Sequence, residues 1–121
     1  MQYHLAEAES RFADLIWANE PLSSGALVQL CAAAFDWKKS TTYTMLRRLC
    51  ERGLFVNDGG TVRAALSREA FDARRSRELV QAEFGGSLPR FLAAFSSGET
   101  LSADEVDALR RLIDNFDGGQ R

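Results

Sequence analysis

The order of local signals in the first half of the chain constrains its fold more than any other feature of the sequence. Apolar residues recur at three- and four-residue spacings over residues 5–19, 24–34 and 41–52, which predicts three short amphipathic helices in series. Pro21 separates the first two helices, because proline cannot continue a helix. Gly53 follows the third, as glycine commonly does after a helix C-terminus.

Serine residues mark where several helices are expected to begin, because a serine hydroxyl can accept a hydrogen bond from a free N–H group of the first turn. Ser23 or Ser24 precedes the second helix, and Ser40 precedes the third. Ser67 and Ser102 stand before two further helical runs in the second half of the chain. The chain is therefore expected to be mainly α-helical.

A β-hairpin is predicted directly after the third helix. Residues 54–56 and 61–63 are β-prone, and the Asn-Asp-Gly-Gly sequence between them is rich in turn-forming residues. Three helices followed by a two-stranded hairpin is the element order of a winged helix-turn-helix, whose third helix enters the DNA major groove. The predicted fold is mainly α with a small β-hairpin wing, and the DNA-binding domain is expected to span residues 1–66.

Residues 67–121 are expected to form a helical dimerisation domain. A long helix through Phe84, a break at residues 85–87, a short helix over residues 88–95 and a final helix are predicted. The apolar side chains of this tail exceed what so short a segment can bury alone, so a second copy of the chain is the expected partner. Packing against the chain's own first domain is the alternative. The residues expected in the dimer interface are Leu79, Phe84, Leu88, Phe91, Leu92, Phe95, Leu109, Leu112, Ile113 and Phe116.

The net charge of −2 conceals a strong local asymmetry. Between Lys38 and Arg63 six cations stand against two anions, a balance of +4, whereas residues 1–36 carry one cation and five anions. Contacts to the phosphate backbone dominate the affinity of proteins for DNA. The basic segment therefore indicates a nucleic-acid partner, although the net charge does not.

The third helix is predicted to turn one face to the protein core and the other to DNA. Thr42, Met45, Leu46 and Leu49 fall within a narrow arc at ~100° per residue and are expected to pack on the first two helices. The opposite face carries hydroxyl groups suited to base edges and cations suited to guanine or phosphate. The N-terminus of the second helix is also expected to offer free backbone N–H groups to a phosphate. The residues expected to contact DNA are Lys38, Lys39, Ser40, Thr41, Tyr43, Thr44, Arg47, Arg48 and, on the wing, Arg63.

Other classes of function find little support in the sequence. The chain has no Ser-His-Asp set, no spacing typical of metal ligands and no glycine-rich phosphate loop, so no enzyme activity, metal site or cofactor is predicted. His4 is expected to be a surface residue, and Cys31 and Cys50 lie on apolar helical positions that favour reduced, packed thiols over a redox switch. Residues 1–5 lack signal-peptide features, and no apolar stretch approaches the ~18 residues of a transmembrane helix. A cytoplasmic protein without membrane insertion is predicted.

A long run of residues resembles a known family. The segment from Trp37 to Leu54, WKKSTTYTMLRRLCERGL, is similar to the recognition-helix signature of the penicillinase and methicillin-resistance repressor family (BlaI/MecI/CopY). The Ala-Glu and Leu-Ile-Trp sequences of the first helix, the Gly-Gly-Ser-Leu break and the acidic final helix add to a resemblance that extends from Leu5 to Phe116.

The resemblance implies a homodimeric repressor bound to a palindromic operator on double-stranded DNA. In the antibiotic-resistance branch of the family, a membrane sensor system leads to cleavage of the repressor in its short C-terminal helix, before a Phe. The matching bond here is Ala94–Phe95, with Ala94 where the best-known members have Asn, and the implied partner is a sensor-linked protease. The copper branch carries Cys-x-Cys motifs near its C-terminus, and no cysteine follows Cys50, which excludes copper sensing by that route.

Two alternative interpretations stand beside this one. A repressor of the phenolic-acid-response (PadR-like) type, released by a small ligand, also joins a winged helix to a helical dimerisation segment. A winged helix that contacts only other proteins is the second alternative. The basic segment argues against the protein-binding module, and salt-sensitive binding to DNA would distinguish a DNA-binding repressor from such a module.

Overall fold

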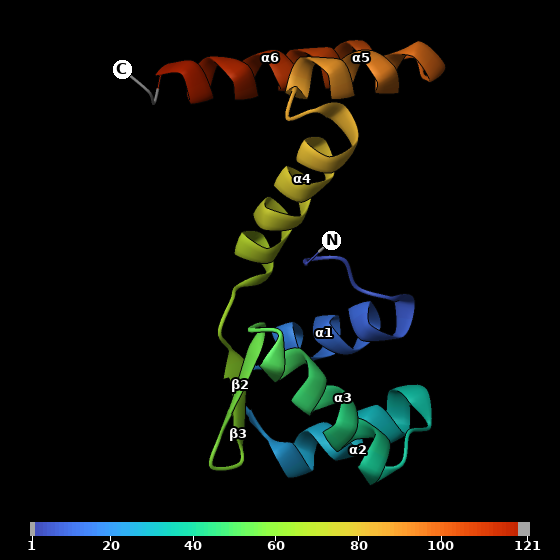
Figure 1. Ribbon diagram of the computed structural model, residues 1–121, viewed down its shortest axis with the longest axis vertical. Helices are drawn as coiled ribbons and strands as arrows, with labels where there is room; N and C mark the ends of the chain where they lie inside the picture. The colour runs from blue at the N-terminus through green and yellow to red at the C-terminus, as the bar shows by residue number, and fades with distance from the viewer. Residues whose placement is uncertain (1, 119–121) are drawn as a thin grey trace. The chain divides into compact units, whose positions relative to one another are not determined.

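The computed structural model describes residues 2–118 and confirms the mainly α fold with a small wing (Figure 1). The chain divides into two compact units, residues 1–79 and 80–121, with the boundary inside α4. Among the described residues, no helix is long and apolar enough to cross a membrane. In chain order the elements are α1 (Glu7–Asn19), β1 (Leu22–Ser23), α2 (Ser24–Phe35), α3 (Lys39–Glu51), β2 (Phe55–Asp58), β3 (Thr61–Ala64), α4 (Arg68–Phe84), α5 (Leu88–Gly98) and α6 (Ala103–Gly118).

The sheet contains one strand that the sequence did not predict. The strand β1 pairs antiparallel with β3, with Leu22 opposite Val62, and gives the order β1-β3-β2. The Ser24 N–H then donates to the Gly60 carbonyl at 2.8 Å. A strand of two residues is too short to display the alternation by which strands are recognised. Its consequence is that the wing is tied to the start of α2.

The wing turns more tightly than predicted. Asn57 and Asp58 belong to β2, so the turn consists of Gly59 and Gly60 alone. Their φ angles of 60° and 96° lie in the left-handed region, which glycine adopts without a steric cost. The Asn57 side chain closes the turn by accepting the Gly60 N–H at 3.1 Å. The hairpin is therefore a two-residue turn of the type that keeps the twist of the flanking strands.

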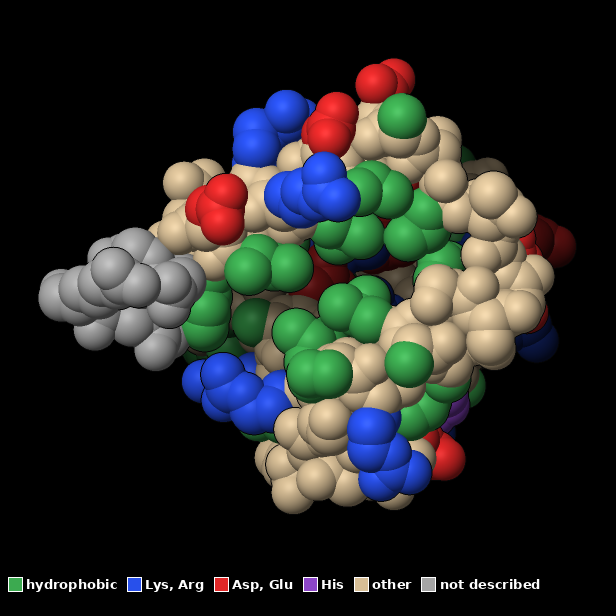
Figure 2. All heavy atoms as spheres, turned by 90° about the horizontal axis from the view of Figure 1, so that it is seen from above, with side chains coloured by type: hydrophobic (Ala, Val, Ile, Leu, Met, Phe, Trp, Pro, Cys, Tyr) green, Lys and Arg blue, Asp and Glu red, His purple; other side chains and the backbone are tan. Residues whose placement is uncertain are grey.

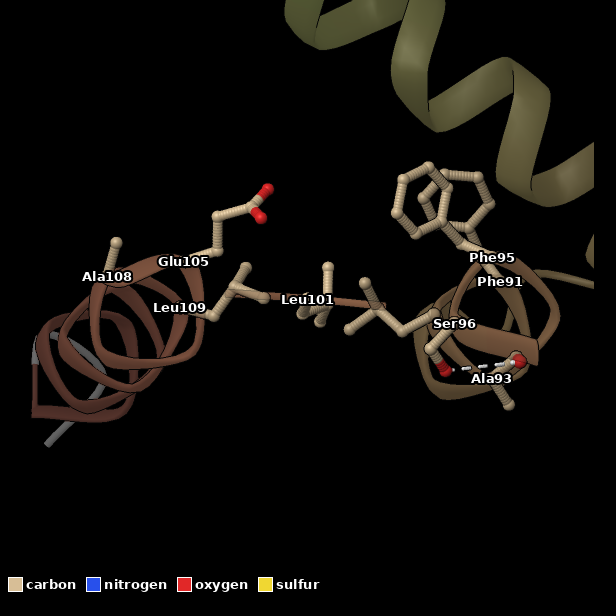
Figure 3. Close-up of a pocket in the computed structure, with 9 residues that line it drawn as sticks. Phe91, Ala93, Phe95, Ser96, Leu101, Glu105, Ala108 and Leu109 are labelled. Atoms are coloured by element: carbon tan, nitrogen blue, oxygen red, sulfur yellow. Dashed lines mark hydrogen bonds between the residues drawn. The ribbon is translucent and has the colours of Figure 1, made fainter. Parts of the chain in front are cut away.

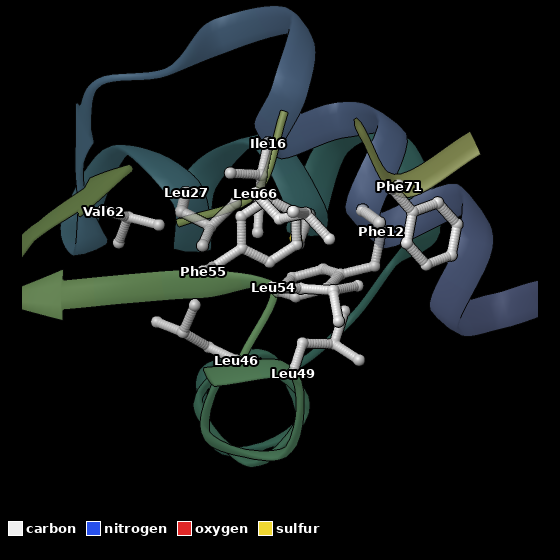
Figure 4. Close-up of a cluster of buried hydrophobic side chains, with 12 residues drawn as sticks. Phe12, Ile16, Leu27, Leu46, Leu49, Leu54, Phe55, Val62, Leu66 and Phe71 are labelled. Atoms are coloured by element: carbon white, nitrogen blue, oxygen red, sulfur yellow. The ribbon is translucent and has the colours of Figure 1, made fainter. Parts of the chain in front are cut away.

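One hydrophobic core holds the first unit together (Figure 4). Trp17 closes one side of it, because its indole N–H donates to the Leu66 carbonyl at 3.0 Å and its ring lies 5.3 Å from the ring of Phe55 and 5.4 Å from that of Phe71. Phe71 is 2% exposed, so the first turn of α4 belongs to this core. The buried apolar residues are Phe12, Ala13, Ile16, Leu27, Cys31, Leu46, Leu49, Leu54, Phe55, Val62, Leu66 and Phe71.

The domain boundary expected after Leu66 differs from the division that the structure gives after Leu79. The reason is that the first three turns of α4 pack with the preceding elements instead of with α5 and α6. Ser67 does cap α4, accepting the Ala70 N–H at 3.0 Å, as its position suggested. A helix cap marks where a helix begins, and it carries no information on which unit the helix packs against.

Two helix starts were predicted at the wrong residue. The helix α1 begins at Glu7 and not at Leu5, because Ala6 adopts the extended N-cap conformation and its N–H donates to the Glu9 carboxylate at 3.0 Å. The helix α3 begins at Lys39, with Lys38 as its N-cap, so the prediction of Ser40 as the cap is wrong. The Lys38 carbonyl already accepts the Thr42 N–H at 3.1 Å.

The second unit contains the rest of α4 together with α5 and α6. Gly85 and Gly86 form the break before α5 with φ angles of 59° and 80°, and the Ser87 hydroxyl caps α5 by accepting the Arg90 N–H at 3.2 Å. The helix α5 continues to Gly98, three residues beyond the predicted end. The rings of Phe84 and Phe91 meet edge to face at 5.3 Å. None of residues 80–116 is buried.

Candidate nucleic-acid interface and apolar C-terminal surface

The helix α3 has the two faces that its sequence predicts. Thr42, Leu46 and Leu49 are buried, and Met45 is half-buried. The other residues of α3, apart from the half-buried Tyr43 and Cys50, have exposed side chains. Of the residues predicted to contact DNA, those exposed on this face and its approach are Lys38, Lys39, Ser40, Thr41, Thr44, Arg47 and Arg48.

The start of α3 has the chemistry of an anion site. Lys38 occupies the N-cap position, no side chain caps the helix, and the first turn holds no acidic residue. The first N–H groups of the helix therefore point outward without a side-chain acceptor. Lys38 and Lys39 stand at the positive end of the helix dipole, an arrangement that disfavours the helix unless an anion binds there. A phosphate at this position would satisfy both the N–H groups and the two ammonium groups.

Tyr43 is less free than the sequence suggested. Its ring is half-buried, and its hydroxyl donates to the Ser24 Oγ at 3.1 Å. The ammonium group of Lys39 lies 6.0 Å from the ring centroid. Tyr43 therefore joins α3 to the start of α2 and fixes the spacing of the two helices.

The three arginines near the end of α3 differ in their partners. Arg52 donates to the carbonyls of Gln2 at 2.6 Å and His4 at 2.8 Å, and its Nη1 lies 3.5 Å from the Glu9 carboxylate. The Nη1 of Arg48 lies 3.9 Å from the same carboxylate, while the side chain stays 55% exposed. Arg47 makes no ion pair with any described residue. Arg52, counted as part of the basic segment, thus has a structural role, and Arg47 has the freest guanidinium.

The wing places a further cation, Arg63, on the surface. Arg63 lies 3.8 Å from the Asp58 carboxylate, and the two side chains are 51% and 73% exposed. Exposed pairs of this kind contribute at most about 1 kcal/mol, so the guanidinium can exchange its partner for a phosphate at little cost. The role of Arg63 as a DNA contact stays a prediction, as do the roles of the α3 residues.

The expected phosphate site at the start of α2 is not formed as predicted. The Ser24 N–H donates to the Gly60 carbonyl at 2.8 Å, and the Ala26 N–H donates to the Ser23 Oγ at 3.0 Å. These N–H groups are no longer free, because the unpredicted strand β1 and the Ser23 cap use them. The sequence predicted Ser23 or Ser24 as the cap of α2, and the structure shows that it is Ser23.

The two cysteines are free thiols in the first unit. Burial raises the pKa of Cys31 above its usual range, against a smaller lowering by the Thr42 hydroxyl. Burial also raises the pKa of Cys50, against a hydrogen bond with the Asn57 backbone. A raised pKa keeps a thiol protonated and slow to react, which favours the packed, reduced state expected from the sequence.

The second unit carries an open apolar groove of about 580 Å³ between α5 and α6 (Figure 3). Figure 2 shows hydrophobic side chains gathered around a hollow on this face. Leu112, Ile113 and Phe116 are 65%, 56% and 71% exposed, and these fractions are high for large apolar side chains. The groove is lined by Phe91, Leu92, Ala93, Phe95, Ser96, Leu101, Glu105, Ala108 and Leu109.

Leu79 stands apart from the other residues predicted for the dimer interface. It closes the first unit, where it lies beside His4, Arg75 and Glu78, and it is 37% exposed. The remaining predicted residues all fall in the second unit. Their pairing with a second copy stays a prediction.

The Ala94–Phe95 bond lies inside α5 and not in a loop. The Ala94 carbonyl accepts a hydrogen bond from the Ser97 hydroxyl at 2.8 Å, and Phe95 is 50% exposed. A protease needs an extended substrate, so α5 must open locally before this bond can be cut.

Clusters of metal-ligating side chains are absent from the described part of the chain. No group of three His, Cys, Asp or Glu side chains there could hold a metal ion.

Two sets of long-range hydrogen bonds could not be found from the sequence, those of the N-terminal segment with Glu78 and that of Glu20 with the wing. Glu78 accepts hydrogen bonds from the backbone N–H groups of Gln2 and Tyr3, and Glu20 accepts one from the Ala64 N–H at 2.7 Å. These pairs are separated by 44 to 76 positions, so no local spacing could announce them.

Comparison with known proteins finds similarity to one family of repressors. The family model described as penicillinase repressor matches residues 5–115. The chain is 22% identical over 115 residues to the methicillin resistance regulatory protein MecI of Staphylococcus aureus (strain Mu50 / ATCC 700699), an alignment that covers 92% of this chain and 94% of that protein. Proteins of the same name from Mammaliicoccus sciuri and Staphylococcus epidermidis are each 21% identical over the same shares of the two chains.

Proposed function

This chain belongs to the penicillinase repressor family, and from that premise we propose that it represses transcription by binding a palindromic DNA operator as a homodimer. The observation that carries the proposal is the start of α3, where an uncapped helix N-terminus coincides with Lys38 and Lys39. Phosphate at this end would orient the helix, and the exposed Thr44 and Arg47 would then reach base edges in the major groove.

The first experiment removes the two arginines of α3. The double variant Arg47→Ala, Arg48→Ala should lose at least about 100-fold in affinity for an operator selected from random duplexes, because each base or phosphate contact contributes about 1–3 kcal/mol. The dependence of affinity on salt should also weaken, its slope falling by about 0.9 for each phosphate that the variant leaves without a cation. Fluorescence anisotropy over a salt series measures both quantities.

The matched control keeps the change of net charge and moves it elsewhere. Arg77→Ala, Arg90→Ala also removes two exposed guanidinium groups, and it should bind within about threefold of the wild type. Equal losses in the two double variants would mean that only net charge matters. Unchanged affinity in the α3 variant would remove α3 from the interface and favour a module that binds only proteins.

The homodimer is proposed from the apolar surface of the second unit. A second copy would cover the groove and the exposed Ile113 and Phe116, as the closed two-fold symmetry of most homodimers allows. The variant Ile113→Ser, Phe116→Ser should raise the dissociation constant of the dimer by at least about 100-fold and reduce operator affinity by a similar factor, while affinity for one half-site stays unchanged. Sedimentation velocity gives the first quantity, and Asp114→Asn serves as the control.

Release of the operator by proteolysis is the proposed route of induction. The bond is Ala94–Phe95, and a cut there would separate α6 and its apolar residues from the DNA-binding unit, which removes the avidity of the dimer. Immunoblots of host cells exposed to methicillin, the drug in the relatives' name, should show a shortened wild-type repressor and a full-length Phe95→Leu variant. Full-length wild-type repressor throughout induction would rule out proteolysis and favour release by a small ligand.

A further inference from the structure

The segment before α1, residues 2–5, connects α4 to the end of α3, and we name it the N-terminal strap. On one side of the strap, the two carboxylate oxygens of Glu78 accept the N–H groups of Gln2 at 2.9 Å and Tyr3 at 2.7 Å. Hydrogen bonds to an ionised carboxylate are roughly twice as strong as neutral ones. Both oxygens of Glu78 are used, so its side chain is held in one orientation against the strap.

The other side of the strap is held by Arg52, the C-cap residue of α3. A single nitrogen of its guanidinium donates to the carbonyls of Gln2 at 2.6 Å and His4 at 2.8 Å, and the other terminal nitrogen lies 3.5 Å from the carboxylate of Glu9. The side chain is only 27% exposed. Arg52 is therefore committed to the strap and α1, and it is unavailable for a phosphate.

The ring of Tyr3 adds a third contact, again with α4. It meets Phe71 edge to face at 6.1 Å, while the Arg74 guanidinium lies 5.7 Å from the ring centroid and donates to the Tyr3 hydroxyl at 3.1 Å. Phe71, Arg74 and Glu78 follow the i, i+3, i+7 spacing of one helix face. The strap thus contacts α4 along two turns.

Without the strap, α4 would be fixed to the first unit only at its beginning. Phe71 is the one buried residue among those of α4 that the structure describes. Arg68, in the first turn, pairs with Asp14 and lies 5.5 Å from the ring centroid of Trp17. These contacts hold a point of α4, and a helix held at one point can still tilt.

A small tilt of α4 would matter because this helix leads to the second unit. At 1.5 Å per residue, the distance from Phe71 to Phe84 is about 20 Å. A tilt of about 10° would move the far end by about 3.5 Å, which is close to the rise of one base pair. Dimeric repressors bind half-sites at a spacing that the geometry of the dimer dictates.

We propose that the strap, through Arg52 and Glu78, fixes the direction of α4 relative to α3 and thereby sets the half-site spacing that the dimer accepts. This inference rests on the proposed function, since only a dimer on an operator has a spacing to set. Arg52 and Glu78 are positioning residues, because they act through α4 and do not touch DNA.

The experiment measures affinity for duplexes in which the half-site spacing varies by one base pair in either direction, together with a single half-site. The variants are Glu78→Gln and Arg52→Lys, which keeps the charge beside Glu9 but loses the guanidinium fork. Each should keep half-site affinity within about twofold and lose about fivefold or more of the discrimination between the best spacing and its neighbours. The control Glu83→Gln, an exposed carboxylate on the same helix, should retain full discrimination.

A second measurement is independent of DNA. Amide hydrogen exchange at Tyr3 should be protected in the wild-type dimer and accelerate by about tenfold or more in Glu78→Gln. An unprotected Tyr3 amide in the wild type, or unchanged spacing discrimination in both variants, would overturn the inference. Failure of the wild type to bind any half-site would instead overturn the proposed function, and the role of the strap in spacing with it.

Discussion

The two units of this chain differ in how much of their own apolar surface they bury. The first unit buries twelve apolar residues in one core, including Phe12 and Phe55. In the second, none of residues 80–116 is buried, although Leu112 and Phe116 are 65% and 71% exposed. Because burial of apolar surface is the dominant favourable term in folding, the first unit can be stable alone and the second needs a covering surface. The first unit therefore has the core of an independently folded domain, and the second presents the apolar surface through which we propose that two copies associate.

The largest expected effect tests the difference between the two units directly. Phe12→Ala should destabilise the first unit by about 3–5 kcal/mol, because it removes a fully buried ring and leaves a cavity. Phe116→Ala should change the free energy of unfolding of the first unit by less than about 0.5 kcal/mol, because substitutions at exposed positions usually have small effects on stability. Urea denaturation followed by tryptophan fluorescence measures both, since Trp17 and Trp37 lie in the first unit. Similar losses in the two variants would mean that the units unfold as one.

A second prediction sharpens the boundary between the units. A fragment of residues 1–79 should fold as a monomer, whereas residues 1–66 should be less stable by about 3–5 kcal/mol because they lack the buried ring of Phe71. The loss of Arg68 and its pairing with Asp14 adds little, since both side chains are nearly half exposed. Thermal unfolding of the two fragments at equal concentration is the measurement. Equal stability would support the boundary at Leu66 that the sequence suggested.

The fold was predictable where local pattern and packing agree. The apolar periodicity of α3 correctly placed Thr42, Leu46 and Leu49 in the core, and the Gly59-Gly60 pair correctly placed the hairpin. The strand β1 was missed because two residues carry no period. The cap of α3 was misplaced because serine propensity pointed to Ser40, whereas the backbone of Lys38 already accepts the first hydrogen bond of the helix.

The candidate site was predictable in composition but not in its internal pairing. Sequence periodicity shows that Arg47 and Arg48 leave the core, yet it cannot show that Arg52 is bound to the carbonyls of Gln2 and His4. That pairing depends on a contact across about fifty positions, which only the packed unit creates. A cation count for the basic segment therefore overstates the charge available to DNA.

The third prediction separates folding from function at one residue. Lys38→Asp places a carboxylate at the uncapped N-terminus of α3, where it can accept the free N–H groups and favour the helix dipole. The first unit should gain about 1 kcal/mol of stability, and operator affinity should fall at least about tenfold because the phosphate site is occupied and its charge reversed. Denaturation and anisotropy on the same protein measure the two changes. A loss of both stability and affinity would show that Lys38 serves the fold instead of DNA.

The smallest expected effect concerns the two cysteines, both of which lie in the first unit. They report whether the stability of the first unit depends on the second unit. Burial raises the pKa of both thiols above the ordinary value of 9.0, so the folded state holds these protons more tightly than the unfolded state. Their contribution to stability is then fully present below about pH 9 and is lost as pH rises through the folded pKa values. Cys31→Ala should flatten this alkaline decline, although it lowers stability at every pH.

Alkylation by iodoacetamide at neutral pH makes the same test kinetic. Cys31 is fully buried and Cys50 half-buried, so Cys50 should react first and both should react slowly. Dilution below the dissociation constant of the proposed dimer should leave both rates unchanged, because the first unit keeps its core when the apolar surface of the second becomes exposed to water. Faster labelling of Cys31 on dilution would contradict the independence of the two units, since it would mean that the core of the first opens more often once the partner is gone.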